Sequence, residues 1–481
     1  MEDVAKDALS PSAEEVVMAE PAVDRQEQQT EVKPPPVPVA DQQTEVKPPP
    51  EAVVDQGIDV GISRLTTERI ETVIRQVLDR ETGARLKAYV DTCAHCGLCS
   101  EACHFYLSHD KDPAFSPVGK VKQTLWEMLK KKGRIAPASM KRMVQVAHTE
   151  CNLCKRCSMY CPFGIDIAYL MLVVRRICHK LGITPLYIQD TANSHSVTAN
   201  QMWVKEDEWI DTLQWQEEDA RDELPDLRIP IEKEGADIMY SVIAPEPKFQ
   251  AELIYQAAVI FHVAGLDWTM PATPGWDNSD MAMYTGDNEI MARIKRAHFE
   301  TAARLRVNRI VMGECGHAFR SVYDVGNRVL GWRMPPIRVQ HAIDFYSELL
   351  TEGRIRVAKK FQEPVTLHDP CNVVRGRGLH EKARYVIRET CETLVEMHPN
   401  REHNYCCAAG GGVINCGPPY KRVRMDGNRV KAEQLAATGV KVLVAPCHNC
   451  HSGLEDINHH YKLGMDVKFI SDIIYAVMEK P

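Results

Sequence analysis

The sequence lacks an excess of basic residues, a long hydrophobic run and a secretory leader pattern. Its 58 basic side chains are outnumbered by 66 acidic ones, which argues against a nucleic-acid-binding protein because neutralising phosphates needs a basic surface. The longest unbroken apolar run, 167–174, is far shorter than the ~20 residues of a membrane span. The N-terminus, MEDVAKDALS, has neither a basic start nor an apolar core. We therefore expect a cytoplasmic protein with no transmembrane span of its own.

Cysteine is the residue type that this background leaves unexplained. Thiols stay reduced in the cytoplasm, so a disulfide framework does not account for 17 cysteines. The length of 481 residues suggests two to three domains at roughly 150 residues each, so small-domain stapling is not needed either. Metal binding is the leading explanation.

Residues 1–60 form an acidic, Pro-rich and Gln-rich extension in which QQTEVKPPP occurs twice, at 28–36 and 42–50. Such a segment buries too little apolar surface to offset its ordering entropy, so we predict a disordered tether. A polyproline docking site is the alternative.

The next region, 61–189, is predicted to be mainly helical. Amphipathic spacing after Thr66 indicates one helix, and Pro117 after Ser116 is typical of the start of a second. Ile167 begins a third apolar-faced stretch.

Residues 190–235 are acidic and contain three tryptophans, and we interpret them as an irregular connector, with a partner-docking surface as the alternative. From 236 onward, short apolar strands alternate with helices, which is typical of βα units. Predicted strands lie at 238–244, 309–312, 365–367 and 440–444. A weak internal repeat places GECGHA opposite APCHNC, which suggests two related halves, a degenerate one at 236–350 and a cluster-binding one at 351–481.

Eight cysteines form two runs with x2, x2, x3 spacing, at 93, 96, 99 and 103 and at 151, 154, 157 and 161, the latter followed by Pro162. This is the spacing of two-cluster ferredoxins, in which the fourth cysteine of each run reaches the other cluster. We therefore predict one [4Fe-4S] cubane on Cys93, Cys96, Cys99 and Cys161. The second is predicted on Cys151, Cys154, Cys157 and Cys103. Zinc is disfavoured because its sites use separated CxxC pairs.

Five further cysteines form a second pattern in the C-terminal half: Cys371, Cys406, Cys407, Cys447 and Cys450. They follow predicted strands or precede the glycine-rich AAGGGV, so they should meet at the carboxyl edge of an α/β sheet. CHNCH at 447–451 also matches haem attachment and could form part of a zinc site with its two histidines. Haem attachment needs an export signal, and zinc leaves three cysteines unused.

This combination resembles the catalytic subunits of the heterodisulfide reductase family, and within it the DsrK branch found in DsrMKJOP-type membrane complexes of sulfur metabolism. The resemblance covers roughly 65–481. It implies an α+β multidomain fold, with a helical double-[4Fe-4S] ferredoxin-like domain followed by a pseudo-duplicated α/β CCG domain. It also implies a non-cubane [4Fe-4S] cluster on the five C-terminal cysteines. Ala408 departs from the pattern, since it stands where the family has glycine, and the gap before Cys447 is slightly long.

Four cysteines remain. If the two halves are related, the GECGH loop faces the third cluster, so Cys315 is a candidate extra ligand or redox thiol and His317 a candidate proton donor. A vestigial cysteine and a surface histidine are the alternative. Cys178 and Cys391 are predicted to be core residues, as is Cys416.

The predicted function is electron transfer through two cubanes to a third cluster where an S–S bond is cleaved or formed. The resemblance implies a DsrC-like sulfur carrier protein as substrate, with its disulfide or trisulfide, and a menaquinol-linked DsrM-like cytochrome b as membrane partner. The alternatives are a heterodisulfide reductase subunit acting on a small-molecule disulfide, and an iron–sulfur subunit of a glycolate or lactate oxidase. A purely structural subunit would not explain 13 patterned cysteines.

Overall fold

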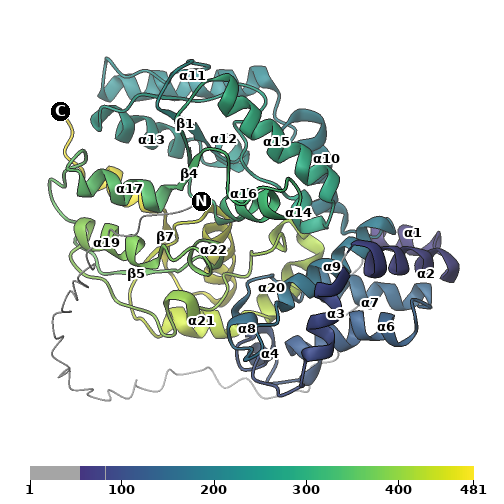
Figure 1. The fold of residues 1–481 in the computed structure, drawn as a ribbon. Helices are drawn as coiled ribbons and strands as arrows, with labels where there is room; N and C mark the ends of the chain where they lie inside the picture. The colour runs from purple at the N-terminus through teal and green to yellow at the C-terminus, as the bar shows by residue number, and fades with distance from the viewer. Residues whose placement is uncertain (1–54, 82) are drawn as a thin grey trace, which may run out of the picture. The chain divides into compact units, whose positions relative to one another are not determined.

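Three regions follow one another in the computed structural model, which describes residues 55–81 and 83–481 (Figure 1). The first is helical and holds both ferredoxin-type motifs. Its α-helices are α1 (Gln56–Ser63), α2 (Thr67–Arg75), α3 (Gly83–Thr92), α4 (His104–Ser108), α5 (Pro117–Val121), α6 (Glu127–Lys130), α7 (Pro137–His148), α8 (Arg156–Met159) and α9 (Ile167–Lys180). The helices predicted to start after Thr66, at Pro117 and at Ile167 are confirmed.

Local capping explains where these helices begin. The Ser116 hydroxyl accepts a hydrogen bond from Gly119 N at 2.9 Å, and Pro117 occupies the first helical position, where its missing N–H costs nothing. Asp166 caps α9 in the same way, accepting from Tyr169 N at 3.0 Å. Sequence and local structure therefore agree in this region.

Residues 1–54 of the predicted disordered extension lie outside the described residues. Residues 55–60 are described, and they do not fit the prediction of disorder. Helix α1 begins at Gln56, and Asp55 caps it by accepting from Gly57 N at 3.0 Å. Asp55 also accepts a hydrogen bond from the Tyr420 hydroxyl at 3.1 Å. Residues 55–60 are therefore ordered by contact with the C-terminal region, and the expected disorder is wrong for them.

The segment 190–235 is not an irregular connector. It holds the end of α10 (Leu186–Thr198) and the 18-residue helix α11 (Glu206–Glu223). Trp209 on α11 is fully buried, stacks on Trp276 at 4.3 Å and donates from Nε1 to Pro271 O at 3.1 Å. The acidic side chains occupy the solvent face of a helix whose other face packs on the α/β core, and this amphipathic pattern was missed.

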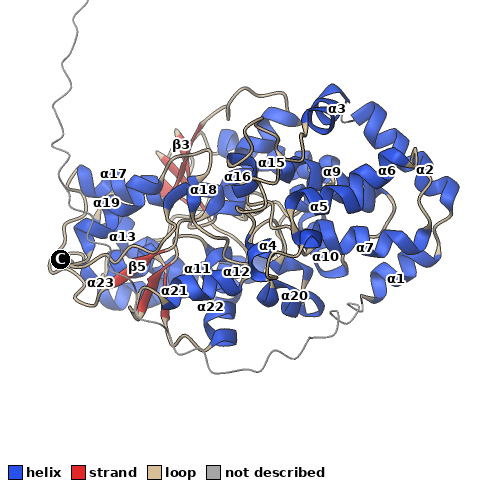
Figure 2. Cartoon of the chain, turned by 90° about the horizontal axis from the view of Figure 1, so that it is seen from below, coloured by secondary structure: helices blue, strands red, loops and turns tan. Residues whose placement is uncertain are grey.

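Two parallel sheets form the rest of the chain, as the alternation of elements predicted. The first has the order β2-β1-β3-β4 and the second β5-β6-β7. Their strands are β1 (Ile238–Ser241), β2 (Trp268–Thr269), β3 (Arg309–Met312), β4 (Arg338–His341), β5 (Val365–Leu367), β6 (Val442–Val444) and β7 (Asp466–Lys468). All four predicted strands exist, although β1 and β6 are shorter than expected. Figure 2 shows them flanked by helices and gathered away from α1–α9.

Helices cover both sheets. Those of the first half are α12 (Pro245–Phe249), α13 (Glu252–Val263), α14 (Ala282–Thr285), α15 (Asn288–Arg304), α16 (Gly316–Arg328) and α17 (Ala342–Thr351). Those of the second are α18 (Cys371–Val374), α19 (His380–Thr390), α20 (Lys421–Asp426), α21 (Arg429–Ala436), α22 (His448–Tyr461) and α23 (Ile470–Val477). Residues from both sheets, such as Val311 and Val444, share one apolar core.

The core of the helical region also continues into the α/β part. Ile177 on α9 belongs to the same buried cluster as Tyr284 of the first half and Cys416 of the second. Cys178, Cys391 and Cys416 are all buried, as predicted. Among the described residues, no helix has the length and apolar character needed to cross a bilayer.

Candidate functional site

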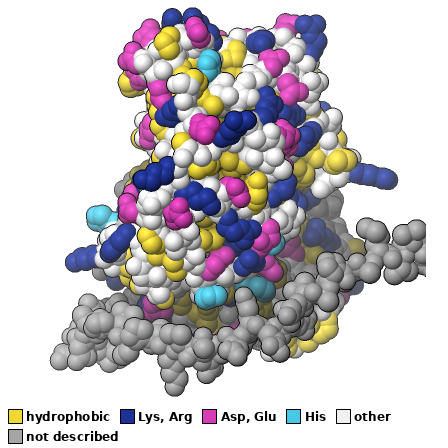
Figure 3. Space-filling model, turned by 90° about the vertical axis from the view of Figure 1, so that its left-hand side faces the viewer, with side chains coloured by type: hydrophobic (Ala, Val, Ile, Leu, Met, Phe, Trp, Pro, Cys, Tyr) yellow, Lys and Arg dark blue, Asp and Glu magenta, His cyan; other side chains and the backbone are white. Residues whose placement is uncertain are grey.

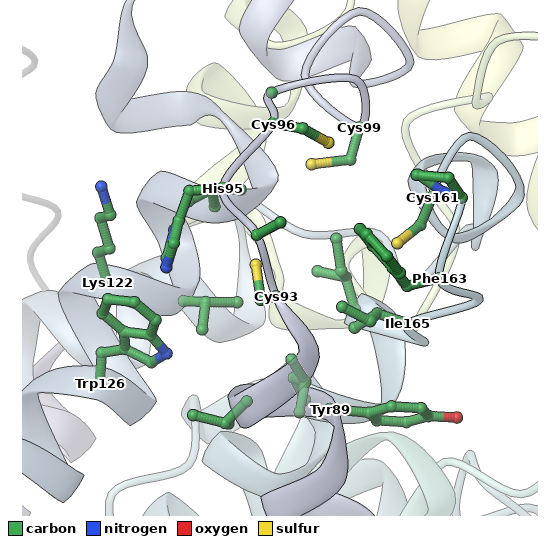
Figure 4. Close-up of a pocket in the computed structure, with 18 residues that line it drawn as sticks. Tyr89, Cys93, His95, Cys96, Cys99, Lys122, Trp126, Cys161, Phe163 and Ile165 are labelled. Atoms are coloured by element: carbon green, nitrogen blue, oxygen red, sulfur yellow. The ribbon is translucent and has the colours of Figure 1, made fainter.

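The first ferredoxin-type set surrounds a single hollow of about 580 Å³. Cys93, Cys96 and Cys99 line it from the loop after α3, and Cys161 reaches it from the second motif. Figure 4 shows the four sulfur atoms around the same space, with Trp126 and Phe163 among the lining side chains. Cys96 is exposed, so this hollow lies next to solvent.

The second set surrounds another hollow, of about 390 Å³, in the exchanged arrangement that the spacing predicted. Cys151, Cys154 and Cys157 line it together with Cys103 from the first motif. Each hollow thus presents four thiols and space between them, which is the donor set of a four-iron cluster. The residues present fit two [4Fe-4S] groups.

A buried cation lies beside the second hollow. Lys120 is 2% exposed, and its Nζ donates to Cys103 Sγ at 3.5 Å and also to Glu150 O. Burial lowers the pKa of Lys120, but the negative charge available on Cys103 and Cys151 raises it by more, so the net pKa is above its ordinary value. Lys120 therefore stays charged next to the thiols. Sequence analysis missed it because nothing local separates this lysine from surface lysines.

Replacing Lys120 with methionine should lower the reduction potential of the second cluster. Removing a buried positive charge disfavours adding an electron nearby, by on the order of 60 mV for one electron and a tenfold change in equilibrium. A redox titration followed by electron paramagnetic resonance measures it. Lys131→Met, at a side chain that is 51% exposed, is the control and should change nothing. An unchanged potential in K120M would show that Lys120 does not act on this cluster.

The five C-terminal cysteines converge at the carboxyl ends of β5 and β6, as expected for neighbouring parallel strands. Cys371 starts α18 just after β5, Cys447 immediately precedes α22 after β6, and Cys450 lies in the first turn of α22. The Cys407 thiol interacts with Cys406 and Cys450, and Cys450 also interacts with Cys447, so that their pKa values depend on one another. All five are buried. A compact set of thiols with no carboxylate among them fits an iron–sulfur cluster.

His368 is a residue of this site that sequence reasoning missed. Its ring nitrogen, Cys407 Sγ and Cys450 Sγ lie within 4.8 Å of one another. His368 Nδ1 accepts from Asn404 Nδ2 at 3.2 Å, so the neutral ring carries its proton on Nε2. The signal was present in the sequence as the segment TLHDPC, where the histidine precedes the first ligand by three residues.

Ala408, which stands where the resembled family has glycine, adopts a backbone conformation that favours glycine. It has φ of 67°, the left-handed conformation that glycine adopts freely and alanine adopts at a cost of about 1–2 kcal/mol. Gly411 is needed for another reason, since a Cβ there would come within 2.5 Å of Asn152 O. The loop after the cysteine pair is thus pressed against the second ferredoxin-type loop.

The second hollow and the C-terminal cysteines meet directly. Cys154 and Cys406 are neighbours, and their interaction lowers the pKa of the Cys154 thiol well below its ordinary value. Asn152 Nδ2 donates to Ala408 O and Gly410 O, both at 3.2 Å. Arg375 NH1 donates to Cys154 O at 2.9 Å. The second hollow therefore adjoins the buried C-terminal thiol site.

Cys315 and His317 both lie at the C-terminal cysteines, where the internal repeat placed them. Gly316 N donates to Cys447 Sγ at 3.3 Å, and burial together with Cys447 raises the pKa of Cys315 well above its ordinary value, so it stays a thiol. His317 is buried and not on the surface. Its Nε2 accepts from Gly411 N at 3.1 Å, so in the neutral ring the proton is on Nδ1, which has no partner among the described residues. Burial lowers its pKa to about 4.

The histidines of CHNCH do not join the thiols. His451 stacks on Phe469 at 4.2 Å, and its Nε2 lies 3.0 Å from Val467 O. His448 Nε2 is buried and has no hydrogen-bond partner among the described residues. The zinc alternative, which needs both histidines beside Cys447 and Cys450, gains no support from this geometry.

Comparison with known proteins separates the two ferredoxin-type motifs from the C-terminal cysteines in the same way. Residues 89–165 match the model of a 4Fe-4S dicluster domain, and residues 365–455 match that of a cysteine-rich domain. The chain is 26% identical over 438 residues to the Hdr-like menaquinol oxidoreductase iron-sulfur subunit 2 of Archaeoglobus fulgidus, covering 76% of each chain. It is 24% identical over 431 residues to the Hdr-like menaquinol oxidoreductase iron-sulfur subunit of Archaeoglobus profundus, covering 76% of this chain and 75% of the relative.

A third relative is one of the subunits of the dihydromethanophenazine:CoB--CoM heterodisulfide reductase of Methanosarcina mazei. It is 25% identical over 398 residues, which span 80% of this chain and 93% of the relative. Together these matches support an iron–sulfur oxidoreductase of the heterodisulfide reductase-like kind.

Proposed function

We propose that this protein is the catalytic subunit of a membrane-bound electron-transfer complex and moves electrons between a quinol and an S–S bond. The observation that carries the proposal is the contact of Cys154 with Cys406, which joins the second ferredoxin-type hollow to the buried thiol site. The exposure of Cys96 supports an entry point for electrons at the surface. Bound iron–sulfur clusters would supply one-electron transfer along this series.

We assign the ends of the path as follows. Oxidation of menaquinol by a DsrM-like cytochrome b partner releases two electrons and two protons. Reduction of a disulfide, RSSR′, consumes two electrons and two protons and yields RSH and R′SH, and the reverse reaction balances equally. The two relatives named as menaquinol oxidoreductase subunits support the quinol end. For the sulfur end we propose a disulfide or trisulfide on a DsrC-like carrier protein, as in the DsrK branch.

The residues of the chain have distinct proposed roles. The eight ferredoxin-type cysteines hold two cubanes, and the five C-terminal cysteines hold a non-cubane cluster. Lys120 and Arg375 provide positive charge beside the thiols, and His368 donates to Cys407. Neutral His317 presents Nδ1–H as a hydrogen-bond donor. Cys315 is proposed as an extra cluster ligand or a redox thiol. The two sheets, each with a cysteine-bearing loop after a central strand, are proposed to be a pseudo-duplicate within one catalytic domain.

Iron content and spectroscopy of the purified, cofactor-loaded protein test the proposal. We expect about 12 iron atoms per chain, since three four-iron clusters are proposed. Electron paramagnetic resonance of the oxidised protein should change when a thiol product is added, because the third cluster is the one that meets substrate. Reduced methyl viologen should be oxidised when a disulfide is supplied. About eight irons, with no thiol-sensitive signal, would remove the third cluster and the function with it.

A further inference from the structure

An open cleft leads from the surface to the edge of the buried thiol site. Its volume is about 590 Å³, and Cys371 and Cys154 line its inner end. All three regions contribute walls, with Lys155 from the helical region, Arg320 from the first α/β half and Arg377 from the second. Small-molecule pockets typically enclose about 300–1,000 Å³, so this cleft has the volume of an ordinary ligand pocket.

The lining of this cleft is positively charged in a protein of net charge −8. Its five cations are Arg85, Lys155, Arg320, Arg375 and Arg377, and its three carboxylates are Asp166, Asp324 and Glu402. The surplus is therefore two positive charges. On the face seen in Figure 3, by contrast, basic and acidic side chains are interspersed.

Part of the positive charge in the cleft has no carboxylate of its own to neutralise it. Asp324 accepts from Arg320 at 2.9 Å and lies 3.8 Å from Arg377, so one carboxylate serves two arginines. Arg375 donates to three backbone carbonyls, those of Cys154, Glu402 and Asn404, and has no carboxylate partner among the described residues. A cleft with low-dielectric walls concentrates such a field on an incoming anion.

Arg377 is the cation best placed to meet that anion. Its side chain is 28% exposed and lies over the Tyr323 ring at 4.2 Å, which fixes its position. Its Nε is buried and makes no hydrogen bond within the described part of the chain. Arg320 and Arg375, at 8% and 9% exposed, lie deeper and are held by their backbone contacts. The cations thus extend from the mouth toward Cys371.

We propose that this cleft is the substrate entrance and that it selects a disulfide bearing a carboxylate, which Arg377 binds while the S–S bond reaches the Cys371 end. The proposal rests on the proposed function for the chemistry at that end. Arginine is suited to the role because its planar fork matches a carboxylate. The carboxylate can belong to a small thiol acid or to a peptide.

Binding can be measured apart from turnover. Without an electron donor, calorimetric titration of the oxidised, cluster-loaded protein gives the Kd of 3,3′-dithiodipropionate and of neutral bis(2-hydroxyethyl) disulfide. We expect the dianion to bind more tightly and its affinity to fall with salt. Arg377→Gln should weaken its Kd roughly tenfold, as expected for the loss of one charge-assisted contact, and Arg377→Lys less. Arg306→Gln, at a side chain 70% exposed outside the cleft, is the matched control.

A second pair of probes identifies the source of the carboxylate. A short cystine peptide with a free C-terminal carboxylate is compared with the same peptide amidated. If tighter binding of the acid is seen only in the peptide pair, the carboxylate belongs to a peptide. If it is seen only in the pair of small disulfides, the carboxylate belongs to a small thiol acid. No preference in either pair, or an R377Q protein that binds like wild type, overturns the inference.

Turnover separates this inference from the function on which it rests. With reduced methyl viologen as donor, R377Q should raise KM for the dianion and leave kcat little changed, because Arg377 is proposed to bind the carboxylate and not the reacting sulfur atoms. If wild type binds the dianion through Arg377 but reduces no disulfide, the proposed function fails and the binding site stands. If it reduces both disulfides without charge preference, the function stands and the cleft assignment fails.

Discussion

Replacing Cys407 with alanine is expected to lower the iron content from about 12 to about 8 atoms per chain and to abolish disulfide reduction. Cys407 lies among the other candidate ligands, since its thiol interacts with Cys406, Cys450 and His368. Cys407 lines neither of the two ferredoxin-type hollows. The clusters proposed there should therefore remain and still accept electrons from reduced viologen. Iron analysis, electron paramagnetic resonance and viologen oxidation together measure the result.

Cys391→Ala is the matched control for this substitution. Cys391 is also a buried cysteine of the second half, at 3% exposed, but it packs in the apolar core beside Thr390. It should retain about 12 irons and full turnover, with only a modest loss of stability. A C407A protein that kept 12 irons and an unaltered spectrum would show that the five cysteines do not hold a cluster.

Replacing Arg175 with methionine is expected to lower the free energy of unfolding by about 3–5 kcal/mol, the largest stability effect we foresee. Arg175 on α9 is fully buried and donates to backbone carbonyls of all three regions. Its Nε donates to Ala147 O at 2.7 Å, while NH2 donates to Cys151 O at 2.8 Å and NH1 to Tyr284 O at 3.0 Å and to Gly411 O. Methionine fills similar space but leaves these carbonyls without a donor.

The consequence for function follows from where those carbonyls lie. Cys151 begins the second ferredoxin-type motif and Gly411 belongs to the loop after Cys407, so the same guanidinium joins the two loops between which electrons are proposed to pass. The apparent Tm should fall by on the order of 5–15 °C, measured calorimetrically at one scan rate. Rapid-mixing spectroscopy should show slower oxidation of the second cluster by disulfide. Arg175→Lys keeps the charge but cannot span the partners, so it should recover only part of both.

An unchanged Tm in R175M would mean that the carbonyls find other donors, and the structural role would be wrong. A lowered Tm with unchanged electron transfer would confine Arg175 to stability.

The ferredoxin-type motifs could be predicted from sequence because their geometry is local. Three ligands in each run come from one short loop, so the x2, x2 spacing determines their placement, and the fourth ligand follows from a general rule. The carboxyl-end position of Cys371 and Cys447 was equally accessible, since it needs only the order of strands and loops. Where the chemistry depends on residues close in sequence, the pattern was sufficient.

Contacts between regions were not predictable in this way. Arg175 stands in the apolar run of α9, and a buried arginine in an apolar helix is visible in sequence only as an anomaly. Its partners lie as far away as Gly411. The same holds for the contact of Cys154 with Cys406, which depends on how the regions dock. The segment around Trp209 was predicted to be an irregular connector because it is acidic. Its stacking partner, Trp276, lies far away in the sequence and could not be inferred from the local pattern.

The gradient of burial along the three sites has a consequence for damage by oxygen. Cys96 is exposed, whereas Cys406 and Cys407 are 2% and 1% exposed. Oxidation of thiols and thiolates follows their accessibility, so air should reach the outermost cluster first. If the proposed clusters are present, the protein would then lose its connection to the proposed electron donor while the buried thiol site stayed intact, and repair of the outermost cluster would restore it.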